Sequence, residues 1–191
     1  MKGFAAILLS VVLLSVAVPA QGQETDKDRL GMAIDYFQAA KYHEALLIFR
    51  QLDKDYELNP RIKAYMGVCH YYEWEYEEAV AILDPLLDQL EAFAPPERSV
   101  YYYSDAESHF QLGHYERAIP PYERTLNVCH ADERGDILYR LGFCYLYQDD
   151  KPNAMEYFSS ALAYYIAFPS DQRRQQTAQL KHMIAGLAQD L

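Results

Sequence analysis

The sequence predicts an all-α protein built from about four repeated helical hairpins and one further helix at the C-terminal end. Three features support this fold: an alanine that recurs at intervals of 34, 39 and 36 residues, a small residue at a fixed distance before it, and large residues at fixed distances around it. Self-similarity with a period of about 20 to 50 residues is typical of repeat architectures, whose units stack to bury a continuous core.

The recurring alanine sets the register of the repeats. Twelve positions before it the residue is small, nine positions before it stands tyrosine or histidine, and four positions after it stands a large apolar or aromatic residue. Small residues let two helices approach closely, and the larger residues fill the space between successive hairpins. We therefore expect the repeat-packing positions to be Ala33, Ala45, Gly67, Ala79, Ala106, Ala118, Gly142 and Ala154.

This pattern resembles the tetratricopeptide repeat, a helix–turn–helix unit of about 34 residues. Its clearest copies run from Tyr65-Met66-Gly67 to Ala79, from Gly113 to Ala118, and from Leu141 to Tyr145. The resemblance covers residues 26 to about 168. It implies a right-handed α-solenoid with repeats at about 26–59, 60–93, 99–132 and 135–168.

Three departures from the repeat pattern each predict a local structural feature. The 39-residue interval leaves five extra residues, which we place in a loop insertion near 94–98 that divides the array into two pairs of repeats. Pro85 should kink or split its helix, because proline cannot donate the helical hydrogen bond. Asp105 stands where the other copies carry Met32, Met66 and Leu141, so the third repeat should be loosened locally.

The C-terminal segment 169–191 is expected to form a capping helix. Pro169-Ser170-Asp171 gives a stop followed by a helix N-cap, and apolar residues then recur on one helical face at Leu180, Ile184, Leu187 and Leu191. Repeat arrays need a terminal cap with a polar outer face. The alternative is that this helix docks on a partner.

The first 20 residues have the features of a secretory signal peptide. Lys2 precedes an uncharged apolar stretch from Phe4 to Val18, and Pro19-Ala20 follows it. The apolar stretch is shorter than the roughly 20 residues of a membrane-spanning helix. We expect cleavage near Ala20 or Gly22, a short linker at 21–25, and export to the periplasm or the medium. The alternative is a leader retained as an anchor.

The charge balance argues against a nucleic-acid partner. The formal net charge is −11, with no cluster of basic residues, and an acidic surface repels phosphate backbones. Three cysteines are too few for a disulfide framework, although the sequence leaves open whether any two of Cys69, Cys129 and Cys144 are paired.

The sequence contains no recognisable catalytic motif, and we expect no catalytic residue, metal or cofactor. His109 and His114 are five residues apart, a poor spacing for one helix face. His70 and His109 stand in the register position that Tyr36 and Tyr145 occupy in the other repeats, so both are expected to be packing residues.

The resemblance also indicates where a partner would bind, because the first helices of tetratricopeptide repeats line a concave groove. Carried onto this chain, the groove positions hold many aromatic residues and lack the Lys and Asn pair that clamps a C-terminal carboxylate in many relatives. The expected partner-binding groove residues are Phe37, Tyr71, Tyr72, Tyr103, Phe110, Tyr139, Phe143 and Tyr147.

Together these features predict a non-catalytic scaffold that binds a protein or peptide with apolar or aromatic anchors. Tyrosine suits such a groove, because it offers a large apolar face and a hydroxyl at low entropic cost. The alternative is a structural protein that forms a homo-oligomer through its C-terminal helix or its aromatic face.

Overall fold

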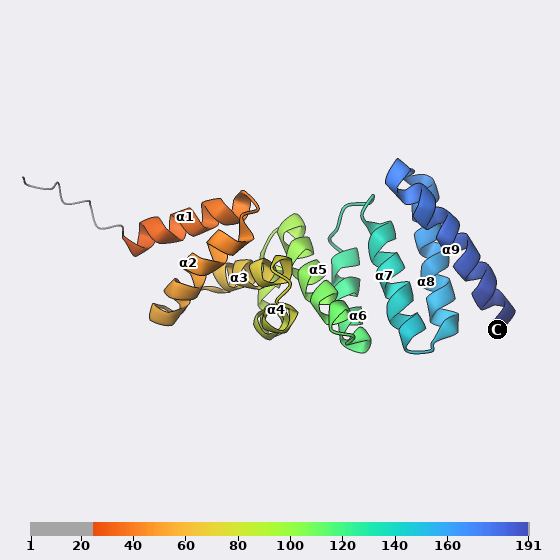
Figure 1. Cartoon of the computed structure of the whole chain (residues 1–191), viewed down its shortest axis with the longest axis horizontal. Coiled ribbons are helices and arrows are strands. Elements are labelled where there is room, and N and C mark those ends of the chain that lie inside the picture. Colours follow the sequence, from red (N-terminus) through yellow and green to blue (C-terminus); the bar gives the residue numbers. More distant parts are fainter. Residues whose placement is uncertain (1–24, 191) are drawn as a thin grey trace, which may run out of the picture.

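The computed structural model describes residues 25–190, and in this range helices follow one another without any strand (Figure 1). The predicted signal peptide and most of the 21–25 linker lie outside the described residues. Two short 3-10 helices, η1 (Asp84–Leu86) and η2 (Gln89–Ala92), separate α4 from α5. The α-helices are α1 (Asp26–Gln38), α2 (Tyr42–Asp55), α3 (Pro60–Tyr72), α4 (Tyr76–Leu83), α5 (Pro95–Gln111), α6 (Tyr115–Leu126), α7 (Arg134–Tyr147), α8 (Lys151–Ala167) and α9 (Asp171–Asp190).

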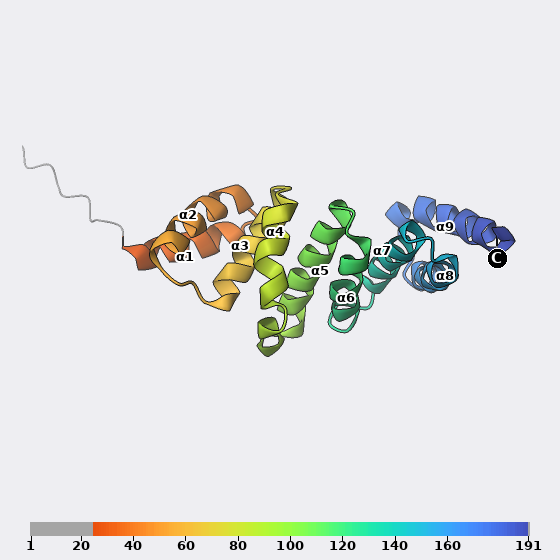
Figure 2. The same ribbon diagram turned by 90° about the horizontal axis from the view of Figure 1, so that it is seen from below.

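The helices form an elongated array of hairpins. Helices α1 and α2, α3 and α4, α5 and α6, and α7 and α8 pack as pairs, and each pair also packs on the next one. Figures 1 and 2 show the pairs following one another along the long axis, with α9 at the far end. The structure therefore confirms the predicted all-α repeat solenoid, in which each unit contacts only its neighbours.

Each hairpin turns through the same backbone motif. The residue five positions before the register alanine has a positive φ in every repeat, at Ala40 (56°), Trp74 (63°), Gly113 (75°) and Asp149 (61°). The next residue's N–H donates to the carbonyl five residues upstream, always at 2.9 Å: Lys41 to Tyr36, Glu75 to His70, His114 to His109 and Asp150 to Tyr145. This is the Schellman termination of a helix. Only the third repeat has glycine at this positive-φ position, so the other three repeats bear the steric cost of a left-handed residue with a side chain.

Small residues between the paired helices explain how closely the helices approach. Six alanines have no exposed surface, namely the four register alanines and the two that stand twelve positions before a register alanine: Ala33, Ala45, Ala79, Ala106, Ala118 and Ala154. A Cβ built on Gly67 would lie 2.6 Å from Leu83 Cγ, and one built on Gly142 would lie 2.4 Å from Phe158 Cδ1. Any larger residue at these two glycines would push the paired helices apart.

The structure corrects the predicted loop near 94–98. Residues Pro95–Arg98 form the first turn of α5, because proline fits the first helical position, where the missing N–H has no partner to lose. The extra residues are instead found in η1 and η2. Helix α4 ends at Leu83 and tightens into η1 at Pro85, which agrees with the expectation that this proline splits its helix.

Helix α9 closes the described end of the array. Leu180 is fully buried and Leu187 is 8% exposed, and both join the core cluster of α7 and α8. Among the helices of residues 25–190, none combines the length and the apolar character that crossing a membrane requires.

Candidate functional site

The first helices of the second, third and fourth repeats enclose a hollow on one face of the array. This cavity of about 310 Å³ lies among α3, α5 and α7. Two of its apolar side chains are well exposed, Tyr72 at 46% and Val100 at 43%. The lining residues are Tyr72, Ser99, Val100, Tyr103, Glu133, Asp136 and Ile137.

A second hollow of about 310 Å³ continues the first toward α9. It shares Tyr103 and Asp136 with the first cavity and adds Tyr139, Arg140, Tyr165 and Gln176. The two hollows together form a groove that follows the first helices of successive repeats, and we call it the concave groove. Three of the eight predicted groove residues line it, namely Tyr72, Tyr103 and Tyr139.

The other predicted groove residues lie in ring clusters on either side. Toward the N-terminus, Phe37 stacks on Tyr65 with ring centroids 4.3 Å apart, and Tyr71 contacts Tyr72 at 4.9 Å. Toward the C-terminus, Tyr147 lies 6.2 Å from Phe110 and 5.7 Å from Phe143. None of the eight side chains is fully buried, and Tyr72 and Tyr147 are the exposed ones. The structure thus places them in two ring clusters rather than in one stripe, and Tyr103 lines both hollows between the clusters.

A partly buried ion pair, formed by Arg140 and the enclosed Glu107, contributes to the wall of the second hollow. The Arg140 Nε lies 2.7 Å from Glu107 Oε1 and its Nη2 lies 3.0 Å from Glu107 Oε2, a two-point contact. Tyr122 donates its hydroxyl to Glu107 Oε1 at 2.5 Å, and burial together with the Glu107 charge raises the pKa of Tyr122 well above its usual value. The Arg140 guanidinium also lies 4.8 Å from the centre of the Phe110 ring. These contacts fix Arg140, so the groove presents a rigid cation rather than a mobile one.

Helix α9 contributes to the groove through an ion pair with α7. Arg173 Nη2 lies 2.7 Å from Asp136 Oδ2, and Tyr165 donates to Asp136 Oδ1 at 2.8 Å. Burial, the hydrogen bond and the Asp136 charge raise the pKa of Tyr165 above its usual value. Asp136 is therefore held by α8 and α9 while it lines both hollows.

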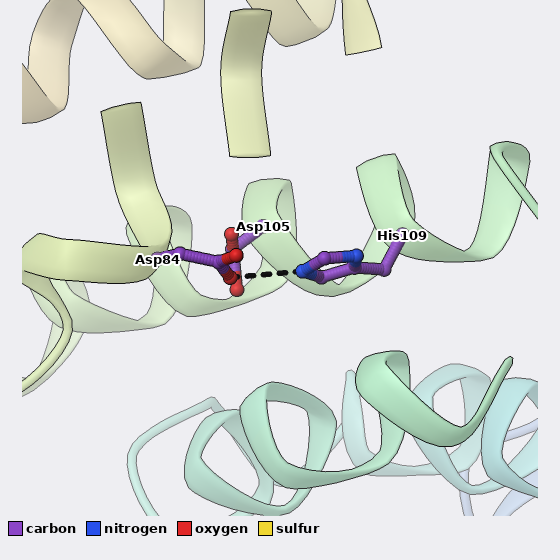
Figure 3. A group of neighbouring side chains, drawn as sticks. All are labelled: Asp84, Asp105 and His109. Atoms are coloured by element: carbon purple, nitrogen blue, oxygen red, sulfur yellow. Dashed lines mark hydrogen bonds and ion pairs between the residues drawn. The ribbon is translucent and has the colours of Figure 1, made fainter. Parts of the chain in front are cut away.

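A second polar group, distinct from the groove, lies between η1 and α5 (Figure 3). His109 Nε2 is 2.8 Å from Asp84 Oδ1, and Asp84 Oδ2 accepts a hydrogen bond from Arg117 at 2.5 Å. Asp105 has no exposed surface, and neither of its carboxylate oxygens has a hydrogen-bond partner. Burial, reinforced by the Asp84 charge, raises the pKa of Asp105 to about 8.

The sequence reasoning missed this group, which we call the Asp84–Asp105–His109 cluster. The expectation that Asp105 loosens the third repeat was incomplete, because the residue is enclosed and faces two other polar side chains. A usable signal was present: Asp105 and His109 are four residues apart, the spacing that places two side chains on one helix face. The rings of His109 and His114, which are five residues apart in the sequence, lie 5.8 Å apart across the turn.

The three cysteines are free in the structure. Cys69 and Cys144 are buried, and burial raises the pKa of each thiol to about 12. Cys129 is only partly buried, and burial raises its pKa as well. Thiols held in the protonated form are poor nucleophiles.

Comparison with known proteins agrees with the repeat architecture. Residues 136–165, which span most of α7 and α8, match the family described as "Tetratricopeptide repeat". A search of curated proteins finds no significant match.

Solved structures with the same fold include two of MamA and one of RapI. MamA from Desulfovibrio magneticus RS-1 has a TM-score of 0.58 at 16% identity, covering 86% of this chain and 93% of that one. Another MamA crystal structure has a TM-score of 0.59 at 15% identity, covering 75% of this chain and 80% of that one. The apo form of RapI has a TM-score of 0.61 at 11% identity, and the match covers 86% of this chain but only 63% of RapI. At these identities the likeness concerns the fold.

Proposed function

We propose that this chain, one repeat of which matches the tetratricopeptide repeat family, is a non-catalytic scaffold that holds a protein or peptide partner in its concave groove. The observation that carries the proposal is the cavity among α3, α5 and α7, where Tyr72 and Val100 are nearly half exposed beside Tyr103. Large apolar side chains left open in a concave site are typical of binding surfaces.

The chemistry of the groove favours an aromatic or aliphatic anchor on the partner. Tyr72 stacks on Tyr42 with ring centroids 4.1 Å apart and an interplanar angle of 3°, so its ring is already held in place. A rigid aromatic wall binds at low entropic cost, because little side-chain freedom is lost. The anchor would enter between Tyr72 and Tyr103.

The charges around the groove favour a basic group beside that anchor. Glu133 lines the first hollow without an ion-pair partner among the described residues, whereas Asp136 is paired with Arg173 and Arg140 is paired with Glu107. The whole chain carries a formal charge of −11, which would attract a cationic partner and repel a nucleic acid. We propose that this binding takes place in the periplasm or outside the cell, on the basis of the signal-peptide pattern of residues 1–20.

Selection of peptides tests this proposal without knowledge of the natural partner. Short random peptides selected on the wild-type protein should carry an aromatic or large aliphatic anchor next to lysine or arginine. The double variant Tyr72→Ala, Tyr103→Ala should bind these peptides at least about tenfold more weakly, because hot-spot aromatics contribute more than about 1.4 kcal/mol.

Trp74→Ala provides the matched control. Trp74 is 79% exposed but lies in the turn between α3 and α4, outside the groove residues, so its loss should leave peptide binding unchanged. Peptides without an apolar anchor, or equal binding to the groove variant and the control, would refute the proposal. A cooperative thermal transition of each variant establishes that the fold is retained.

A second candidate function is self-association near the C-terminal end of α8. Ile166 is 61% exposed and Phe168 is 39% exposed, and Ile166 borders a hollow against α9. If this surface joins two copies, light scattering should give a dimer that Ile166→Ser, Phe168→Ser converts to a monomer. A monomeric wild-type protein would exclude this candidate.

A further inference from the structure

We propose that Asp84, Asp105 and His109 form a binding site for one divalent metal ion of the zinc type, at the junction of the second and third repeats. This inference is independent of the groove. It rests on the arrangement of the three side chains in Figure 3, where the two carboxylates and the His109 ring converge on one point. One ligand atom from each residue lies within 4.8 Å of the other two.

Two elements bring these ligands together. Asp105 and His109 project from one face of α5, because they are four residues apart. Asp84 is the first residue of η1, where the tightened turn at Pro85 ends α4 and places the carboxylate against α5. The site therefore links consecutive repeats, and a bound ion would fasten the junction that contains the inserted 3-10 turns.

The buried Asp105 carboxylate is the observation that points to a ligand. It is fully enclosed, and neither oxygen receives a hydrogen bond. A buried polar group without a partner destabilises the folded state, and a charged one does so more strongly. Two cations act on Asp105, and both are engaged elsewhere: Arg117 donates to Oδ2 of Asp84, and Arg124 is paired with Asp88. A metal ion between Asp105, Asp84 Oδ1 and His109 Nε2 would supply the missing positive charge.

The existing contacts are compatible with coordination. Ligand atoms of a tetrahedral zinc ion lie about 3.3–3.6 Å apart, given metal–ligand distances of about 2.0–2.2 Å. The His109–Asp84 separation of 2.8 Å would widen slightly, and the Asp105 oxygen already lies within 4.8 Å of both ligand atoms. Arg117 on the second oxygen of Asp84 would then orient that ligand from the outer shell, a common arrangement around protein metals.

The chemistry of the three ligands indicates which class of metal ion would bind. Two carboxylates and one imidazole suit zinc and similar transition-metal ions, which accept three protein ligands and one water. Calcium and magnesium prefer oxygen ligands in larger number. Asp84 is 32% exposed whereas Asp105 and His109 are enclosed, so a metal would enter, and its water would stand, on the Asp84 side.

The preceding repeat offers a natural control. His70 occupies the register position of His109, but Met66 stands at the position of Asp105 and Arg50 at the position of Asp84. His70 Nδ1 lies 2.8 Å from Glu75, and Arg50 is paired with the same carboxylate. The carboxylate that contacts His70 is already held by a cation, so this junction should bind no metal.

Metal titration of the purified full chain tests the proposal. We expect one Zn²⁺ per chain in competition with a chromophoric chelator, and one Co²⁺ whose visible absorption indicates four- or five-coordination. Asp105→Asn and His109→Gln should each weaken binding by at least about a hundredfold, more than the loss of an outer-shell partner. His70→Gln should leave the affinity unchanged.

The metal-binding test can still be interpreted if one ligand variant fails to fold. Asp84→Asn alters a partly exposed ligand and provides a third independent variant, and helicity measured without metal identifies folded samples. Zn²⁺ should also raise the melting temperature of the wild type and of His70→Gln, but of no folded ligand variant. Absence of stoichiometric binding, or equal binding to wild type and folded ligand variants, would overturn the proposal.

Discussion

The two buried histidines of the array, His70 and His109, show how one repeat frame accommodates opposite electrostatic environments. The carbonyl of each accepts the hydrogen bond of the Schellman turn that terminates its helix, and both side chains are almost fully enclosed, at 4% and 1% exposure. Around His70, Arg50 and Glu75 form a compensated pair at 2.5 Å. Around His109, two carboxylates face the ring, and a guanidinium reaches only one of them.

This difference shows that backbone and burial are set by the repeat, whereas local charge is set by two variable positions. Five residues after the register alanine stands Arg50 in one repeat and Asp84 in the next. Thirteen residues before the following alanine stands Met66 in one repeat and Asp105 in the next. The first junction is therefore a packed and neutralised interface, and the second retains a carboxylate without a partner.

The largest expected effect is a pH dependence of the free energy of unfolding. It arises at the junction of the second and third repeats, here called the His109 junction, and not at the junction of the first and second repeats, here called the His70 junction. With chelator present, the folded state raises the pKa of Asp105 from its ordinary value of 3.8 to about 8, so between these values the folded chain holds a proton that the unfolded chain releases. The groups facing Asp105 are Asp84, His109, Arg117 and Arg124. The stability contribution is complete below pH 3.8 and is lost as the pH rises toward 8.

Denaturation with urea at several pH values would measure this loss. The free energy of unfolding should fall by up to about 1.4 kcal/mol per pH unit between pH 5 and 7 relative to Asp105→Asn, which cannot titrate. The comparison with this variant removes the contributions of all other groups. Parallel pH profiles for wild type and variant would contradict the assignment.

A smaller change in the free energy of unfolding is expected when Asp105 is replaced by methionine, the residue at the equivalent position of the His70 junction. Asp105→Met replaces an unpartnered carboxyl by the apolar residue that fills the equivalent position 66. In metal-free protein near pH 7, the free energy of unfolding should rise by about 1–2 kcal/mol, because the cost of an unsatisfied buried group disappears. Chemical denaturation measures the change, and a destabilised variant would indicate that Asp105 already has a compensating partner.

The smallest effect is expected from removal of the cation at the His70 junction. Arg50 and Glu75 are 41% and 38% exposed, and exposed ion pairs contribute little. Arg50→Ala should therefore lower the free energy of unfolding by less than about 1 kcal/mol. A loss of several kcal/mol would show that burial of His70 depends on Arg50, and that the two junctions differ less than their exposures indicate.

The sequence predicted the hairpins well because the alanine spacing directly records close helix packing. The same pattern misplaced the insertion, since Pro95-Pro96 is as suitable for starting a helix as for forming a loop. Asp105 was recognised as unusual, but its neighbour Asp84 lies 21 residues earlier in an irregular segment whose path no periodicity reveals. The groove depends likewise on how repeats stack: Phe37 packs on Tyr65, whereas Tyr72 remains open to solvent.

The inserted turns between α4 and α5 have a consequence for protein engineering. The residues that define the His109 junction, namely Asp84, Asp105, His109, Arg117 and Arg124, fall within the single contiguous segment 84–124. In a repeat array each unit contacts chiefly its neighbours. Such a segment is a transplantable cassette. Inserted into an idealised array of identical repeats, it would carry its polar cluster to any chosen interface and leave the remaining units unchanged.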